Sequence, residues 1–166
     1  MRNLHFSFLF LLLAFAWSSA SSAQEITKGS LSVFADQKNV NMICDFENCT
    51  VDKHSIEYAK DKYDNWDLGV VEITKRFSVG YNDKSKDYCK FGAFPEAKYT
   101  LIYHLFDIDD DQDTKGTIDI IETQSKELVV HIEKANGSAG TFGSFFNLLG
   151  DAFENLGKKL GKLSRK

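Results

Sequence analysis

The chain has 166 residues, and its 24 acidic residues outnumber its 20 lysines and arginines, so the net charge is −4 with neutral histidines. A protein that neutralises the phosphates of a nucleic acid is usually basic, so this balance argues against a nucleic-acid partner. The length suits one ordinary domain with a substantial core.

The first 23 residues have the three-part pattern of a secretory signal peptide. Arg2 provides the charged start, an almost unbroken apolar run covers 4–17, and small residues that include Ser21 and Ala23 close the segment. The run is shorter than the roughly 20 residues that a membrane span needs, although an uncleaved N-terminal anchor is the alternative. No cysteine follows the run to carry a lipid anchor. We therefore expect an exported chain, periplasmic or secreted and not lipid-anchored, that begins at Gln24.

Removal of 1–23 leaves 166 − 23 = 143 residues and a net charge of −5, because Arg2 is lost and 19 basic residues then face 24 acids. No second apolar run is long enough for a transmembrane span. Cys44, Cys49 and Cys89 all lie in this part, where export would allow disulfides to persist. Cys44 and Cys49 would point to opposite faces of a flat strand, so a bridge from either to Cys89 is favoured over one between them. Three buried free thiols are the alternative.

The first half of the mature chain reads as two strands followed by one long helix. Residues 29–35 and 39–52 are rich in Val, Ile, Phe and Thr, which is typical of strands. From 55 to 81 the apolar residues recur in steps of three and four, which predicts a helix with one apolar face. These residues are Ala59, Tyr63, Trp66, Val70, Ile73 and Phe77.

The second half reads as a β meander followed by an amphipathic helix. Strands are predicted at 97–108, 116–123 and 127–134, with short connections between them. In 141–166 the apolar residues again recur in steps of four and three: Phe142, Phe146, Leu149, Phe153, Leu156 and Leu160. Gly143, Gly150 and Gly157 recur every seventh residue. A glycine costs a helix about 1 kcal/mol relative to alanine, so this stripe suggests a face pressed close to another backbone.

Strands and helices are segregated along the chain, which predicts an α+β fold. We expect an antiparallel sheet of about five strands, with one long central helix and a C-terminal amphipathic helix packed on it. Residues 24–140 would form the α+β domain, and 141–166 would form a helix of the same domain.

The mature chain resembles a loose group of small, uncharacterised exported proteins of Bacteroidetes bacteria. The residues that carry the resemblance are Asp45 and Phe46, Thr50 to Asp52, Trp66, the Ala-Lys-Tyr-Thr-Leu run at 97–101 and the Gly-Lys-Lys-Leu-Gly-Lys run at 157–162. The resemblance implies an envelope location and the α+β order. It implies no catalytic residue.

The acidic stretch at 107–122 is the one candidate for a metal site. Counted from Asp111, oxygen-bearing residues stand where a helix–loop–helix calcium loop needs them at positions one, three and nine, with a glycine at six and a glutamate at twelve. Lys115 at position five and the strand-like composition of 118–123 depart from that pattern and favour a solvated turn. A looser calcium site is the alternative, because several carboxylates in one loop attract a hard cation. The candidate ligands are Asp109, Asp111, Asp113, Asp119 and Glu122.

No catalytic motif marks the chain as an enzyme. His104 and His131 fall within predicted strands, where a lone histidine is more often a satisfied face or core residue than a catalyst. The GxSxG and HExxH patterns and phosphate-binding glycine loops do not occur in the sequence.

The C-terminal helix allows three interpretations: a core helix, a handle for an unknown protein partner in the envelope, or a helix that lies on a membrane surface. We expect a non-enzymatic binding or accessory module of the cell envelope. The alternatives are a calcium-binding exported module and an enzyme whose site is assembled from residues distant in sequence.

Overall fold

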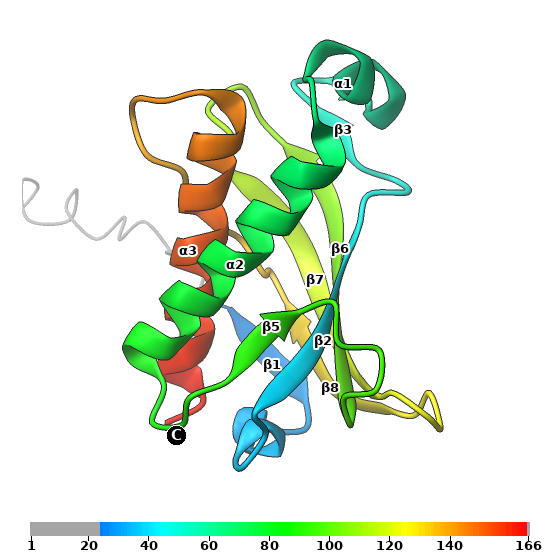
Figure 1. Ribbon diagram of the computed structural model, residues 1–166, viewed down its shortest axis with the longest axis vertical. Coiled ribbons are helices and arrows are strands. Elements are labelled where there is room, and N and C mark those ends of the chain that lie inside the picture. The colour runs from blue at the N-terminus through cyan, green and yellow to red at the C-terminus, as the bar shows by residue number, and fades with distance from the viewer. Residues whose placement is uncertain (1–23, 166) are drawn as a thin grey trace, which may run out of the picture.

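The computed structural model describes residues 24–165, so the predicted signal peptide lies outside the described residues. The elements in chain order are β1 (Glu25–Lys28), a 3₁₀ helix η1 (Leu31–Phe34), β2 (Asn39–Asp45), β3 (Thr50–Val51), β4 (His54–Ser55), α1 (Ile56–Lys62), α2 (Trp66–Lys84), β5 (Lys90–Gly92), β6 (Tyr99–Ile108), β7 (Thr114–Glu122), β8 (Leu128–Glu133) and α3 (Phe145–Leu163). The α+β class is confirmed, and Figure 1 shows how the helices stand against the strands.

Within residues 24–165 the sheet has eight strands and is mixed, so the expectation of about five antiparallel strands was wrong. Its main path runs β1-β8-β7-β6-β2-β5, with β3 beside β6 and β4 beside β3. The meander β6-β7-β8 and the added β1 are antiparallel. β2 runs parallel to both β5 and β6. The physical reason is the connection from β2 to β5 through α1 and α2, because parallel neighbours need a long crossover rather than a tight turn.

The helix predicted over 55–81 is two helices, because the chain turns sharply between them. Tyr63 is extended and Asn65 adopts a left-handed conformation with φ of 59°. Asparagine tolerates that conformation better than most residues. The apolar spacing nevertheless continues across the break, since Ala59, Trp66 and Ile73 are all buried.

The strand predicted over 29–35 was also wrong, since the strand β1 precedes it and η1 replaces most of it. The Ser30 hydroxyl accepts a hydrogen bond from the backbone N–H of Ser32 and caps this short helix. Leu31 and Phe34 still enter the core, as their apolar character requires.

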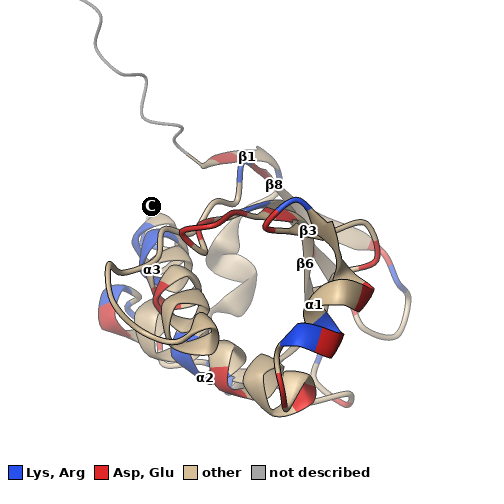
Figure 2. Cartoon of the chain, turned by 90° about the horizontal axis from the view of Figure 1, so that it is seen from above, with Lys and Arg blue, Asp and Glu red and all other residues tan. Residues whose placement is uncertain are grey.

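Helices α2 and α3 cover one face of the sheet. Seen from above, the sheet curves along one side of the molecule and the two helices lie on the other (Figure 2). On β6 and β7, the apolar side chains that face the helices are buried, among them Leu101, Tyr103 and Ile118. The ring of Tyr103 on β6 meets that of Phe153 on α3 edge-on at 5.5 Å. The core therefore lies between this face and the helix pair.

The two helices approach backbone to backbone through glycines, as the glycine stripe predicted, but of its three members only Gly157 makes such a contact. Gly150 faces the Arg76 side chain, and Gly143 precedes α3. Gly157 of α3 lies against the Phe77 carbonyl of α2, and Gly80 of α2 lies against the Glu154 carbonyl of α3. Arg76 adds ion pairs to Asp151 and Glu154 across the same seam.

The apolar stripe of α3 is used in the core. Leu149, Phe153, Leu156 and Leu160 have no exposed surface, and Phe146 packs against the core, whereas Phe142 precedes the helix and is 91% exposed. Four of the six interaction-helix candidates are therefore out of reach of a partner or a membrane surface in this fold. No helix between residues 24 and 165 has the length and apolar composition of a membrane span.

Candidate functional site

Four titratable side chains form a row across four neighbouring strands, and we call this row the ladder: Asp45, His104, Asp119 and His131. The Asp45 carboxylate lies 2.8 Å from Nδ1 of His104, and Nε2 of His104 lies 3.3 Å from the Asp119 carboxylate. The other oxygen of Asp119 lies 2.5 Å from Nδ1 of His131. Each member thus touches the next, from β2 to β8.

The register of the sheet brings these residues together. Asp45 pairs with His104 between the parallel strands β2 and β6, and Asp119 pairs with His131 between β7 and β8. Asp119 lies opposite Ile102, two residues before His104 on the same face of β6. The ladder therefore occupies the sheet face away from α2 and α3.

The contacts of the ladder hold its side chains in place. Both ring nitrogens of His104 face carboxylates. The backbone N–H of Glu47, and then the His104 ring, hold the pKa of the Asp45 carboxyl below its ordinary value. The side chains lie in a row and do not surround a common point. Within residues 24–165, no three His, Cys, Asp or Glu side chains are placed to hold a metal ion together.

The sheet face that carries the ladder, which we call the open face, has no helix across it within residues 24–165 (Figures 1 and 2). Ile43 on β2 is 45% exposed, and Phe106 at the bulge of β6 is 50% exposed. Ladder side chains keep only about a third of their surface, because their neighbours shield them. Large apolar side chains thus alternate with partly buried Asp–His contacts.

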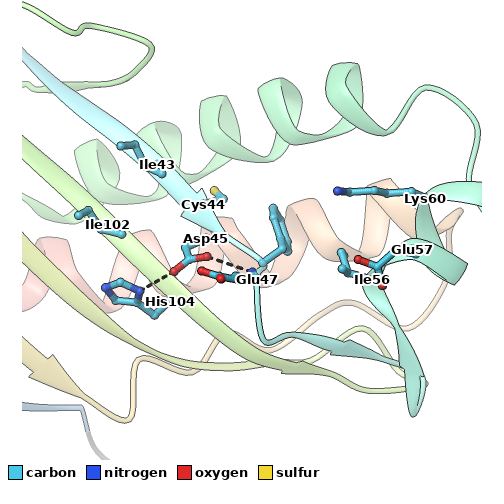
Figure 3. A pocket seen from close by; sticks show the side chains of 10 residues that line it. Ile43, Cys44, Asp45, Glu47, Ile56, Glu57, Lys60, Ile102 and His104 are labelled. Carbon is cyan, nitrogen blue, oxygen red and sulfur yellow. Dashed lines mark hydrogen bonds and ion pairs between the residues drawn. The ribbon is translucent and has the colours of Figure 1, made fainter.

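One end of the open face is hollowed into a pocket of about 570 Å³. Ile43, Ile102 and the Asp45–His104 pair line its sheet side, and α1 forms its other wall (Figure 3). Three carboxylates and one lysine belong to the lining: Asp45, Glu47, Glu57 and Lys60. In Figure 3 the carboxylate of Asp45 points toward the ring of His104 with Glu47 beside it, and Glu57 lies across the pocket on α1.

The five calcium candidates do not lie together. Asp109, Asp111 and Asp113 lie in the loop between β6 and β7, whereas Asp119 and Glu122 belong to β7 and have other hydrogen-bond partners. Asp109 accepts hydrogen bonds from the backbone N–H groups of Asp111 and Asp113, and Asp113 accepts one from Ala139. Asp119 belongs to the ladder instead.

Glu122, the last of the five, accepts a hydrogen bond from Ser125 in the turn after β7. Residues 114–122 form the extended strand β7, so Asp119 and Glu122 do not fold back toward the loop that holds Asp109 and Asp113. The helix–loop–helix ligand set, which the sequence disfavoured against a solvated turn, is therefore not assembled.

All three cysteines are free thiols. Cys49 and Cys89 are buried, and Cys44 lies beside the hydroxyl of Thr74 on α2. Burial raises the pKa of each thiol to about 12, which leaves the unreactive protonated form. Neither a Cys44–Cys89 nor a Cys49–Cys89 disulfide is present. The three cysteines match the alternative prediction of free thiols that pack as small apolar residues.

No local sequence pattern indicates the ladder. By spacing alone His104 and His131 are isolated strand residues, and Asp119 is one of the calcium candidates. Their shared face follows from alternation only once the strand pairing and the bulge after Leu105 are known.

Neither protein-family models nor curated proteins match the chain. Among solved structures it is similar to a PelC dodecamer from Paraburkholderia phytofirmans in space group P6, with a TM-score of 0.48, 10% identity, and coverage of 83% of this chain and 96% of that chain. A dodecamer of a PelC variant from the same organism, in space group C2, gives a TM-score of 0.45 and 12% identity over 83% and 97%. At these values the likeness carries no functional argument.

Proposed function

We propose that the chain is an exported, non-enzymatic module of the cell envelope that holds a partner protein on the open face of its sheet. The leader pattern of residues 1–23 supports export. The open face supports partner binding, because one face of the sheet is covered by α2 and α3 while the other presents Ile43 and Phe106 to solvent.

The composition of the open face carries this proposal. Protein interfaces combine apolar side chains with oriented polar groups, and they differ in this from an ordinary solvated sheet face, where polar residues alternate outward. Ile43, Ile102, Ile121 and Phe106 interrupt the polar alternation there. The ladder fixes charged atoms in place before a partner arrives, which lowers the entropy cost of binding.

The pocket beside α1 gives the partner an anchoring point. Side chains that contribute most to an interface commonly fill a pocket near its centre. Ile43, Ile56 and Ile102 offer apolar walls, while Glu47 and Glu57 outnumber Lys60 at the polar rim. A lysine or arginine side chain fits this chemistry, because its apolar stem and charged head match the walls and the rim. The partner segment would therefore present a basic residue.

The experiment compares native complexes in gentle extracts of the cells that make the protein. We expect the wild-type chain to elute above the size of a monomer, and Ile43→Asp to elute as a monomer because a carboxylate enters the apolar part of the face. Leu68→Asp is the matched control, since Leu68 is 69% exposed on α2, away from the open face. A monomeric wild type, or equal effects of both variants, would contradict the proposal. Circular dichroism checks that both variants fold.

The export half of the proposal has its own test. Fractionation should place the chain outside the cytoplasm, and N-terminal sequencing of that material should begin at Gln24. Cytoplasmic full-length chain would refute export while leaving the binding surface to be judged by the first experiment.

A further inference from the structure

A second hollow lies at the edge of the sheet, between α2 and the short edge strand β5. Figure 1 shows the place of these two elements. We call this hollow the α2–β5 groove, and its volume is about 560 Å³. Val71 and Val79 of α2 and Tyr88 before β5 line it, and all three are more than half exposed. Phe94 follows β5 and adds a fourth apolar side chain. Several of the exposed apolar side chains of the fold are therefore gathered around this one groove.

The charges of this groove have one sign. Lys75 and Lys90 are the charged residues in its lining, and no acidic residue lines it. Lys75 forms an exposed ion pair with Glu72. Lys90 is exposed, and its ammonium contacts no described partner between residues 24 and 165. The rim of the α2–β5 groove therefore carries the ammonium of Lys90, which has no acidic partner among residues 24–165.

The edge of β5 is closed to an added peptide strand. The Ser78 hydroxyl accepts a hydrogen bond from the Phe91 backbone N–H and donates one to the Phe91 carbonyl. Asn82 makes the same pair of contacts with the backbone of Cys89. Strand addition needs these backbone groups, so side chains of α2 have taken the place that a peptide would occupy. The occupant must instead bind through apolar and charged contacts.

The recessed shape favours a small molecule over a membrane surface. Ligand sites for small molecules have volumes of about 300–1,000 Å³, are mostly apolar, and carry a few polar groups that orient the ligand. Membrane-surface binding instead needs a protruding apolar face with several basic residues. Here the apolar groups line a hollow, and its charged residues are two lysines.

We propose that the α2–β5 groove binds a single amphipathic anion, one acyl chain that ends in a carboxylate or phosphate head group. The chain lies against Val71, Val79 and Phe94, and the head group meets the ammonium of Lys90. This is a ligand site separate from the partner surface, and it goes beyond the proposed function.

The test titrates the purified mature chain, residues 24–166, with monomeric dodecanoate below its micelle concentration, and with dodecylammonium as the cationic counterpart. Dodecanoate should bind saturably at one molecule per chain, and dodecylammonium should bind more weakly. Val79→Asp should weaken dodecanoate binding by about tenfold or more, because it places a carboxylate in the apolar wall. Lys90→Gln should weaken it by about two- to fivefold, as loss of an exposed charge pair does.

Matched controls separate the groove from general stickiness. Leu68→Asp changes a similarly exposed apolar residue of α2 outside the groove, and Lys162→Gln removes an exposed lysine of α3. Both variants should leave dodecanoate binding unchanged. Absence of saturable binding, equal loss in Leu68→Asp and Val79→Asp, or a preference for dodecylammonium would each overturn the proposal. So would binding to anionic vesicles without binding to monomeric dodecanoate.

Discussion

Replacement of Gly157 by alanine tests the backbone contact between α2 and α3. A Cβ on Gly157 would fall well inside 3.0 Å of the Phe77 carbonyl oxygen, a separation that real Cβ atoms essentially never show. The obstacle is backbone on a packed helix, so it can move only if the two helices separate. Overpacking of this kind costs about 1–3 kcal/mol.

Gly150→Ala on the same helix is the matched control. Its added Cβ would meet the Arg76 side chain, 2.7 Å from Cδ, and a flexible side chain can shift. Alanine is otherwise the better helix former by about 1 kcal/mol. The free energies of unfolding of the two variants should therefore differ by about 2 kcal/mol or more, with Gly157→Ala the less stable.

Thermal and urea unfolding followed by circular dichroism measure this difference directly. For a domain of this size, 2 kcal/mol corresponds to about 8 °C in melting temperature. If Gly157→Ala were as stable as Gly150→Ala, the close approach of the two backbones would be refuted.

A chain stopped after Gly140 should lose cooperative unfolding and aggregate, because Leu149 and Phe153 leave the core with α3; a folded monomer by circular dichroism and light scattering would contradict this. Asp45→Asn should reduce the loss of stability in acid. Folding lowers the pKa of the Asp45 carboxyl, so its contribution to stability is present above about pH 4 and disappears as the pH falls through the folded pKa. If the urea midpoints of wild type and variant changed equally between about pH 7 and pH 3, this prediction would be refuted. Calcium should not raise the melting temperature relative to chelator, because Asp109 and Asp113 already accept backbone hydrogen bonds; bound calcium at a hundred times its dissociation constant would add about 2.7 kcal/mol.

Local signals predicted the elements whose partners are near in sequence. The meander from β6 to β8 needs only short turns between alternating strands, and the period of α3 matches its buried stripe, including Phe153 and Leu156. The glycine stripe correctly indicated close packing at Gly157, because the helix cost of glycine needs a compensating contact.

Long-range pairing explains what the sequence did not predict. The helical segment between β2 and β5 is also what a parallel crossover requires. The separation of helices from strands along the chain favoured an antiparallel sheet instead. The ladder depends on the same pairing, since Asp45 reaches His104 only because β2 lies beside β6 in parallel. Residues so far apart in sequence share a site only once the strand order is known.

Site-specific photo-crosslinking in the cells that make the protein tests the central claim most directly. A photoreactive residue at position 106, on the open face, should give one discrete adduct with a different protein, whereas the same residue at position 68, on α2, should give none. The two positions carry the exposed apolar side chains of Phe106 and Leu68. No adduct at position 106, equal adducts at both positions, or an adduct that contains only a second copy of this chain would contradict the assignment of the open face as a partner surface.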